Sequence, residues 1–366
     1  MAIKRAVCTM SLGRCFAGHS LVHKLDAASR HGFTGIELFY EDLVALARDM
    51  SVSSSGGSSG DTQADQLSAA ASIRRLCADR ALEIICLQPF THYEGLLDRD
   101  LHARRVQEMR FWVRLAHALG TDLICLPSSF LAVSELTDDM ATIADDLRVL
   151  ADIGLASTPV IRFAYEALCW GTRVDTWEAS WDVVERVARP NFGICLDTFN
   201  IAGRIYADPT APSGRTHGCD AALAASLRRL VSTVERSKVF LVQLADAERL
   251  ARPLDQTHLF HVAGQPPRMS WSRNARLFYG ETAHGAYLPV KSVLDAIVRG
   301  LGYKGWLSFE VFNRRLADVD EDVPDKMARR AAISWEKMAR DMHLETVAAT
   351  GNNHVATDRE RTQAML

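Results

Sequence analysis

The sequence lacks the patterns that mark membrane proteins and nucleic-acid-binding proteins. It contains no run of about 18 uninterrupted apolar residues, the length that a membrane-spanning helix needs. It contains no Lys/Arg block comparable to a nucleic-acid-binding arm, and its formal net charge is −3. These absences argue against a membrane span and predict that neither a membrane nor nucleic acid is a partner.

The cysteines also lack a pairing pattern. Eight are scattered without any CxxC pair, and most lie inside apolar runs such as EIICLQ and DLICLP. The first residues, MAIKRAVCTMSLG, indicate a strand rather than the apolar segment of a signal peptide. We therefore expect reduced, buried cysteines and a cytoplasmic location, because disulfide frameworks belong mainly to small secreted chains.

The chain instead shows one alternation repeated eight times, in which a short apolar segment is followed by a longer amphipathic one. The apolar segments are nearly continuous, as expected of parallel strands covered by helices. We predict strands at about 4–11, 35–40, 83–88, 122–128, 160–168, 192–199, 239–245 and 306–312. We predict helices at 20–31, 65–80, 101–120, 135–154, 176–187, 221–234, 290–300 and 324–341, several ending at a glycine: Gly32, Gly120, Gly154 and Gly302.

Eight strand–helix pairs predict a single (β/α)8 TIM barrel of the α/β class. The open, dinucleotide-binding sheet is disfavoured because no GxGxxG follows the first strand. The predicted catalytic barrel spans 1–345, with a Gly/Ser-rich surface insertion at 51–61 and a long loop at 246–289 that lies on the active-site face as a lid. Residues 346–366 are predicted to be a flexible tail.

Polar side chains end four consecutive predicted strands. They are Glu166, Asp197, Gln243 and Glu310. Barrel active sites lie at the C-terminal ends of the strands, and an unpaired carboxylate among apolar neighbours is costly to bury. Three carboxylates and an amide oxygen form the all-oxygen set that Mg²⁺ or Mn²⁺ prefers, with Co²⁺ as an alternative. The competing interpretation is a network of ion pairs, such as Glu310 with Arg314.

Several motifs resemble a known family. YEALCWG, CLDTFNIAGR, QLADAE, SFEVFNRR, FTHYEGLLDRDLHARR and SWSRNARLF are similar to segments of the 3-dehydroshikimate dehydratases of the fungal quinate pathway, within the sugar-phosphate isomerase/epimerase-like barrels. The resemblance covers nearly the whole predicted barrel. It implies dehydration of 3-dehydroshikimate, a small molecule, to protocatechuate, with one divalent metal held by the same four residues. The metal would act as a Lewis acid on the C3 carbonyl and stabilise the enolate. A homo-oligomer is left open.

The resemblance also directs attention to the acid and base. Asn200 stands three positions after Asp197, where bacterial relatives carry histidine, and an amide cannot exchange a proton at neutral pH. The predicted catalytic set is therefore His92, Asn200 and Glu94, with His92 as first candidate for the base because imidazole transfers protons near pH 7. The alternative for Glu94 is a salt bridge to a nearby arginine, Arg99 or Arg104.

For substrate binding, Arg276 and Ser272 match family positions that contact substrate. A guanidinium is a natural partner for the substrate carboxylate. Arg204 is an alternative clamp, Trp170 is a candidate for the pocket wall, and Arg273 is interpreted as a cap of a lid helix.

Two other functions stay open. One is a sugar or inositol isomerase, epimerase or dehydratase of the same barrel group, and the other is a non-catalytic sugar-acid sensor. An abasic-site endonuclease of this fold would need several histidine ligands for zinc and a basic face.

Overall fold

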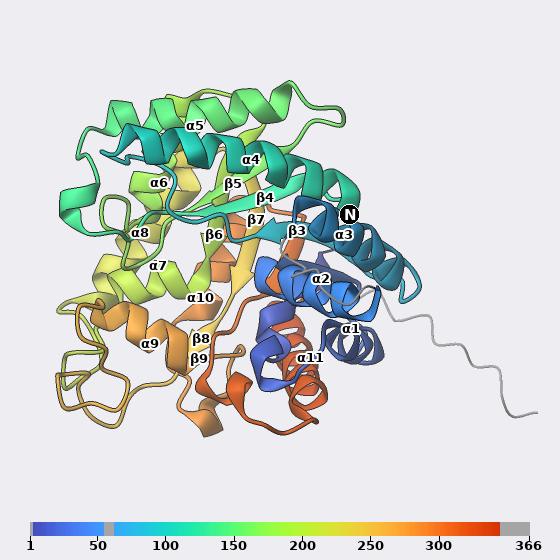
Figure 1. The fold of residues 1–366 in the computed structure, drawn as a ribbon. Coiled ribbons are helices and arrows are strands. Elements are labelled where there is room, and N and C mark those ends of the chain that lie inside the picture. The colour runs from blue at the N-terminus through green and yellow to red at the C-terminus, as the bar shows by residue number, and fades with distance from the viewer. Residues whose placement is uncertain (1–2, 55–61, 345–366) are drawn as a thin grey trace, which may run out of the picture.

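The predicted apolar segments form eight parallel strands that close into a barrel in the computed structural model, which describes residues 3–54 and 62–344. The order around the barrel is β1-β10-β7-β6-β5-β4-β3-β2 (Figure 1). The strands are β1 Lys4–Cys8, β2 Gly35–Phe39, β3 Glu83–Gln88, β4 Leu123–Pro127, β5 Arg162–Glu166, β6 Phe192–Asp197, β7 Val239–Leu244 and β10 Trp306–Phe309. The predicted barrel is confirmed, with most strands shorter than predicted.

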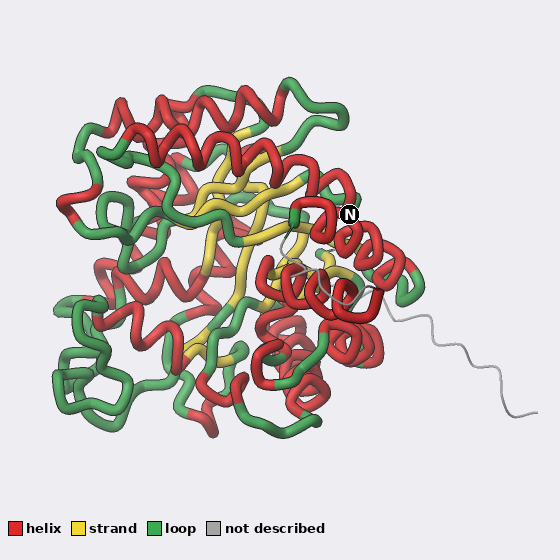
Figure 2. Tube along the Cα trace, in the orientation of Figure 1, coloured by secondary structure: helices red, strands yellow, loops and turns green. Residues whose placement is uncertain are grey.

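Helices surround the strands, as the red segments around the yellow ones show (Figure 2). They are α1 Leu21–Arg30, α2 Tyr40–Ser54, α3 Gln63–Ala78, α4 Arg99–Leu119, α5 Met140–Leu155, α6 Trp177–Val187, α7 Thr198–Ile205, α8 Cys219–Thr233, α9 Pro267–Ala275, α10 Val290–Leu294 and α11 Val323–Asp341. A π-helical turn, Asp295–Gly300, extends α10. Every predicted helix is present, whereas α2, α7 and α9 were not predicted.

Two local predictions are corrected. Residues 51–54 are the last turn of α2 rather than part of an insertion, and 55–61 lie outside the described residues, as does the predicted tail. Gly154 does not end its helix, because α5 continues to Leu155. A Cβ on Gly154 would lie 2.4 Å from the carbonyl oxygen of Ile161, so this glycine permits close packing of α5 against the chain that leads into β5.

The segment 246–289 is more ordered than the predicted loop. It begins with β8 Asp246–Ala247, which pairs antiparallel with β9 Arg276–Leu277. Between these strands lies α9, whose last turn carries Ser272 and Arg273. This strand pair fixes Arg276 beside the end of the barrel at which β7 finishes.

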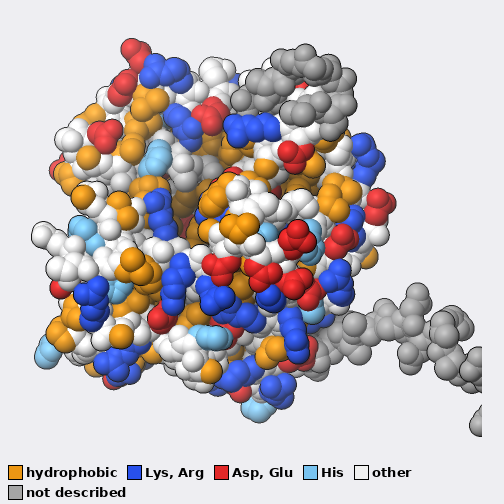
Figure 3. Space-filling model, turned by 60° about the horizontal axis from the view of Figure 1, so that its bottom comes forward, with side chains coloured by type: hydrophobic (Ala, Val, Ile, Leu, Met, Phe, Trp, Pro, Cys, Tyr) orange, Lys and Arg blue, Asp and Glu red, His pale blue; other side chains and the backbone are white. Residues whose placement is uncertain are grey.

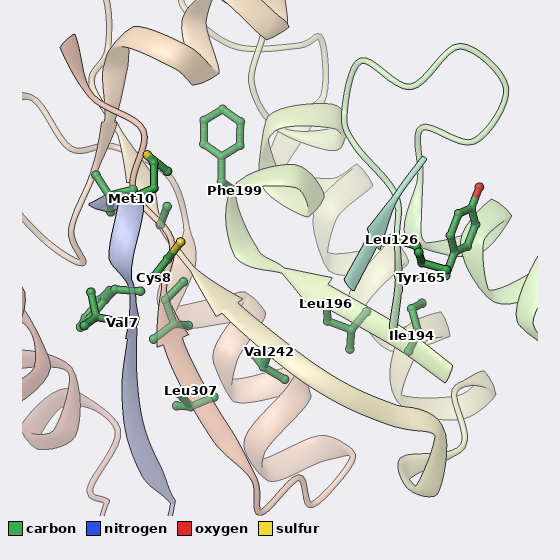
Figure 4. Packing of buried hydrophobic residues seen from close by; sticks show 14 of the residues in the cluster. Val7, Cys8, Met10, Leu126, Tyr165, Ile194, Leu196, Phe199, Val242 and Leu307 are labelled. Carbon is green, nitrogen blue, oxygen red and sulfur yellow. The ribbon is translucent and has the colours of Figure 1, made fainter. Parts of the chain in front are cut away.

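The interior of the barrel changes from apolar to polar along the strands. Side chains alternate between the two faces of a strand, so every second residue points inward. The inner apolar cluster is Ala6, Ile85, Cys86, Leu123, Cys125, Ala164, Cys195 and Leu241. Two residues further on, β5, β6 and β7 carry Glu166, Asp197 and Gln243. The alternate positions, such as Ile194, Leu196, Val242 and Leu307, belong to the larger cluster that includes the helices (Figure 4).

A buried ion pair joins the first two helices. Lys24 Nζ on α1 lies 2.6 Å from Asp42 Oδ1 on α2, and the two side chains are 0% and 2% exposed. Asp42 stands in the first turn of α2, where a negative charge is favourable. A buried ion pair contributes little net stability, but loss of either member is costly because the other charge stays buried.

None of the helices within residues 3–54 and 62–344 has the combination of length and apolar composition needed to cross a bilayer. On the face that carries β8 and β9, acidic and basic side chains lie next to one another rather than forming a field of one sign (Figure 3).

Candidate metal centre and active site

Three carboxylates meet at the C-terminal end of the barrel, which we call the mouth. Glu166 ends β5, Asp197 ends β6, and Glu310 directly follows β10. One oxygen of each lies within 4.8 Å of the others, and all three side chains are buried. Gln243 on β7 pairs in register with Asp197. The structure therefore places the four predicted ligands at one level of the mouth, and we call them the oxygen site.

The charges of this site are poorly compensated. Burial, followed by repulsion from Glu310 and Asp197, raises the pKa of Glu166 well above its ordinary value. Burial also raises the pKa values of Asp197 and Glu310, although Arg276 opposes this effect. Among the described residues, Arg276 is the one basic side chain ion-paired with these carboxylates. A divalent cation would compensate the remaining charge, and the oxygen donors suit a hard ion.

Two further polar residues, Glu37 on β2 and Gln88 on β3, support the oxygen site and were not predicted from the sequence. Gln243 Nε2 donates to Glu37 Oε2 at 2.7 Å, and Gln88 Nε2 donates to the same oxygen at 2.9 Å and to Glu310 Oε1 at 3.0 Å. The bond to Glu37 fixes the Gln243 amide so that its oxygen points away from that carboxylate, where it accepts a hydrogen bond from the Cys195 thiol at 3.3 Å. Burial and Glu310 raise the pKa of Glu37 to about 8. Gln88 ends the strand EIICLQ, so the criterion used for the last four strands would have found it, whereas Glu37 lies in the middle of GIELFY and does not meet that criterion.

Arg276 is buried at the mouth with a side chain that is 1% exposed. Its Nη1 donates to Asp197 Oδ2 at 2.8 Å and to Glu310 Oε2 at 3.0 Å. The guanidinium carbon lies 4.2 Å from the ring centre of Phe199 and 5.1 Å from that of Phe312. The competing ion pair predicted for Glu310 is thus with Arg276, not Arg314.

Asn200 bridges two of the predicted ligands. Its Nδ2 donates to Glu166 Oε1 at 2.7 Å and to Asp197 Oδ2 at 2.8 Å, while its Oδ1 accepts from the backbone N–H of Cys169 at 3.0 Å. The contact with Cys169 fixes which end of the amide faces the carboxylates. Asn200 therefore links the two carboxylates to the backbone of Cys169.

A cavity of about 150 Å³ opens above the carboxylates. It is smaller than the ~300–1,000 Å³ of pockets for drug-sized ligands, so it suits a small molecule. Of the predicted residues, those that line it are Glu166, Glu310, Trp170, Ser272 and Arg276. Arg273, interpreted from the sequence as a helix cap, lines the cavity as well.

His92 is not among the cavity-lining residues, but it follows Thr91 in the chain and packs on Phe130, and both of these residues line the cavity. Its Nδ1 is 3.4 Å from Ser129 Oγ, and its ring centre is 4.2 Å from that of Phe130. Burial, followed by repulsion from Arg105, lowers the pKa of His92. Its backbone has a φ of 55°, which is uncommon for a residue other than glycine and is often found at functional sites.

Glu94 is buried and forms neither of the salt bridges that were considered as the alternative to a catalytic role, with Arg99 or with Arg104. It accepts from the Ser129 backbone N–H at 2.6 Å and from the Tyr165 hydroxyl at 3.0 Å. Arg99 pairs instead with Asp146, at 2.6 Å. Burial raises the pKa of Glu94 to about 7. The bond to Ser129 connects Glu94 to the loop that contacts His92.

Two arginines considered in the sequence lie away from the cavity. Arg204 Nε bonds Asp175 Oδ2 at 2.7 Å and is not among the cavity-lining residues. Arg314 Nη1 bonds Glu248 Oε2 at 2.6 Å. Arg204 is therefore not brought to the site as a clamp in this structure.

Comparison with known proteins identifies relatives of this chain. Residues 25–338 match the family described as xylose isomerase-like TIM barrel. A 3-dehydroshikimate dehydratase of Neurospora crassa is 55% identical over 344 residues, which cover 94% of this chain and 96% of that protein. A 3-dehydroshikimate dehydratase of Pseudomonas aeruginosa is 32% identical, covering 97% of this chain but 44% of that protein.

A solved structure described as a xylose isomerase-like TIM barrel/4-hydroxyphenylpyruvate dioxygenase fusion protein superposes with a TM-score of 0.67 at 26% identity, covering 93% of this chain and 43% of that one. The family match extends over most of the chain, and the Neurospora relative is aligned almost from end to end. The chain belongs to the xylose isomerase-like TIM barrel family.

Proposed function

We propose that this protein is a metal-dependent 3-dehydroshikimate dehydratase, which removes water from 3-dehydroshikimate and forms protocatechuate. The observation that carries the proposal is the group of three buried carboxylates, with oxygens within 4.8 Å of one another, of which Glu166 and Glu310 line a cavity that two arginines also line. The Neurospora relative with that name, 55% identical over 94% of this chain, supports the substrate.

Glu166, Asp197, Gln243 and Glu310 would hold one divalent cation, either Mg²⁺, Mn²⁺ or Co²⁺. When bound, the cation supplies a Lewis acid for the ketone oxygen of the substrate, an effect worth several kcal/mol. Asn200 keeps Glu166 and Asp197 directed at the cavity through its two amide hydrogen bonds.

His92 is proposed as the base that removes the proton next to the carbonyl. Its lowered pKa keeps the imidazole neutral at pH 7, the form that accepts a proton. Glu94 positions it indirectly, because the Ser129 segment that contacts His92 is itself bonded to Glu94. Glu166 and Glu310 line the cavity, and His92 adjoins two other lining residues, Thr91 and Phe130.

The substrate carboxylate is assigned to Arg273, with Ser272 and Arg276 beside it. Arg276 is bonded to two carboxylates of the protein, whereas Arg273 donates to the neutral Gln265 Oε1 at 2.9 Å. No ion pair within residues 3–54 and 62–344 involves Arg273. A cation at a cavity wall without an acidic partner is suited to bind an anionic substrate group.

Replacing Arg273 with glutamine is expected to raise KM for 3-dehydroshikimate by about 10- to 100-fold, since a hydrogen bond to a charged group contributes about 1.5–3 kcal/mol. The KM of Arg273→Lys should lie between those of the wild type and Arg273→Gln, because lysine keeps the positive charge but lacks the planar guanidinium. Steady-state kinetics measures both. Arg252→Gln, on the same segment but outside the cavity wall, is the control, and an unchanged KM in Arg273→Gln would contradict the assignment.

The function is tested by removing the metal. Protein stripped with a chelator should leave 3-dehydroshikimate unchanged, and adding Mg²⁺, Mn²⁺ or Co²⁺ should restore the ultraviolet absorbance of the aromatic product. A sugar epimerase or isomerase of this family, or a sensor, would give no aromatic product under any metal. That outcome would overturn the proposed reaction.

A further inference from the structure

Two cysteines lie inside the barrel, one step of the strand pleat below the oxygen site. Cys195 precedes Asp197 by two residues on β6, and Cys125 is on β4. Both belong to the inner cluster and are buried. The strand between them, β5, contributes only the methyl group of Ala164 to this cluster, so no bulky side chain separates the two thiols.

The thiols meet a carboxylate at this level. Cys125 Sγ, Cys195 Sγ and one oxygen of Glu166 all lie within 4.8 Å of one another. The oxygen of Glu166 on the thiol side is Oε2, 4.0 Å from Cys125 Sγ, while Oε1 accepts from Asn200. Cys195 Sγ is 3.3 Å from Gln243 Oε1, the oxygen that Glu37 leaves free. Two thiols and a carboxylate oxygen thus lie close together, and the amide oxygen of Gln243 lies beside one of the thiols, so that four neighbouring strands each contribute one donor atom.

We propose that Cys125, Cys195 and Glu166, with the amide oxygen of Gln243, form a second cation site, which takes a thiophilic divalent ion such as Zn²⁺ or Cd²⁺. Two sulfur donors select soft and borderline ions, whereas the all-oxygen set above them selects hard ones. Four protein donors suit the tetrahedral geometry of Zn²⁺. On binding, each thiol gives its proton to solvent and its sulfur donates to the ion. We call this group the thiol site.

The thiol site shares Glu166 and Gln243 with the oxygen site. The effect of this sharing on activity, described next, rests on the proposed function. An ion held by the sulfurs draws on the negative charge of Glu166 and repels a second cation just above it. Thiophilic ions should therefore weaken the binding of Mg²⁺ or Mn²⁺ and inhibit the enzyme. Activity would then depend on the ratio of hard to thiophilic ions as well as on the amount of activator.

Cadmium binding tests the thiol site directly. The reduced, chelator-stripped full chain is titrated with Cd²⁺ while the ultraviolet thiolate-to-cadmium charge-transfer band is recorded. We expect a saturable band in the wild type and its loss in both Cys125→Ala and Cys195→Ala. Cys219→Ala, which removes a buried cysteine of α8 outside the barrel, should keep the band. Circular dichroism verifies that each variant is folded. If one of the two barrel variants does not fold, the other can still be compared with Cys219→Ala.

A wild type without the band, or a band that survives in Cys195→Ala, would overturn the thiol site. Sharing of Glu166 is tested by the electron paramagnetic resonance of Mn²⁺: Cd²⁺ should displace bound Mn²⁺ in the wild type but not in Cys195→Ala. Equal Mn²⁺ binding with and without Cd²⁺ would overturn the competition. Because the cadmium band does not require turnover, failure of the dehydratase assignment is distinguishable from failure of this proposal.

Discussion

Asp197→Asn should lower kcat/KM for 3-dehydroshikimate by about a thousandfold or more, even with excess metal. Asp197 Oδ2 accepts from both Arg276 and Asn200, and Oδ1 accepts from the Phe199 N–H. An amide removes the ligand charge and turns a donor toward one of these donors. Metal-ion catalysis contributes several kcal/mol, and each 1.36 kcal/mol is tenfold in rate.

Steady-state kinetics and Mn²⁺ titration measure the two effects of this change. Asp175→Asn is the matched control, because Asp175 pairs with Arg204 outside the cavity and should leave both quantities near their wild-type values. Activity within tenfold of the wild type, with unchanged Mn²⁺ affinity, would exclude Asp197 as a ligand.

Lys24→Met should lower the free energy of unfolding by about 3–5 kcal/mol, the cost of leaving one charge of a buried pair uncompensated. Both side chains are almost fully buried, so solvent cannot replace the lost partner of Asp42. The result should appear as an earlier midpoint in urea unfolding with the slope unchanged. Activity in the remaining folded protein should be unaffected, because the pair lies outside the cavity wall.

Two comparisons separate this effect from a loss of packing. In the double variant Lys24→Met, Asp42→Leu, much of the stability should return, because apolar replacement of a whole buried pair is often neutral. Lys291→Met, which breaks a half-exposed pair between Lys291 on α10 and Asp295 at the start of the π-helical turn, should cost less than 1 kcal/mol. Equal losses in Lys24→Met and Lys291→Met would contradict the argument.

The sequence predicted the barrel because its strands are covered on both sides and are therefore nearly continuous in apolar residues. Two of the helices that were not predicted begin where the apolar pattern of the preceding strand continues without a break. Helix α7 starts directly after Asp197, whose carboxylate caps it, and its first residues, TFNI, look like a continuation of the strand. Helix α2 was not predicted, because its last residues, 51–54, were interpreted as the start of the Gly/Ser-rich insertion.

The four residues of the oxygen site could be predicted because each is a polar end to an apolar strand. Of their partners, Gln88 also ends an apolar strand, but the contact made by Arg276 could not be predicted in this way. The contact of Arg276 with Asp197 joins residues 79 positions apart and depends on the β8–β9 pair, which has two residues in each strand. Glu94 was predicted as a catalytic residue, with a salt bridge as the alternative, but the Tyr165 hydroxyl and the Ser129 N–H that bind it reach it only in the folded barrel.

The guanidinium of Arg276, stacked between two aromatic rings and bonded to two carboxylates, acts as an internal counter-ion. A chain with such a resident positive charge can fold before it is loaded, unlike small zinc domains whose folding requires the ion. Asp197 and Glu310 are also predicted metal ligands, so a bound cation and this guanidinium would share the negative charge of the same two carboxylates.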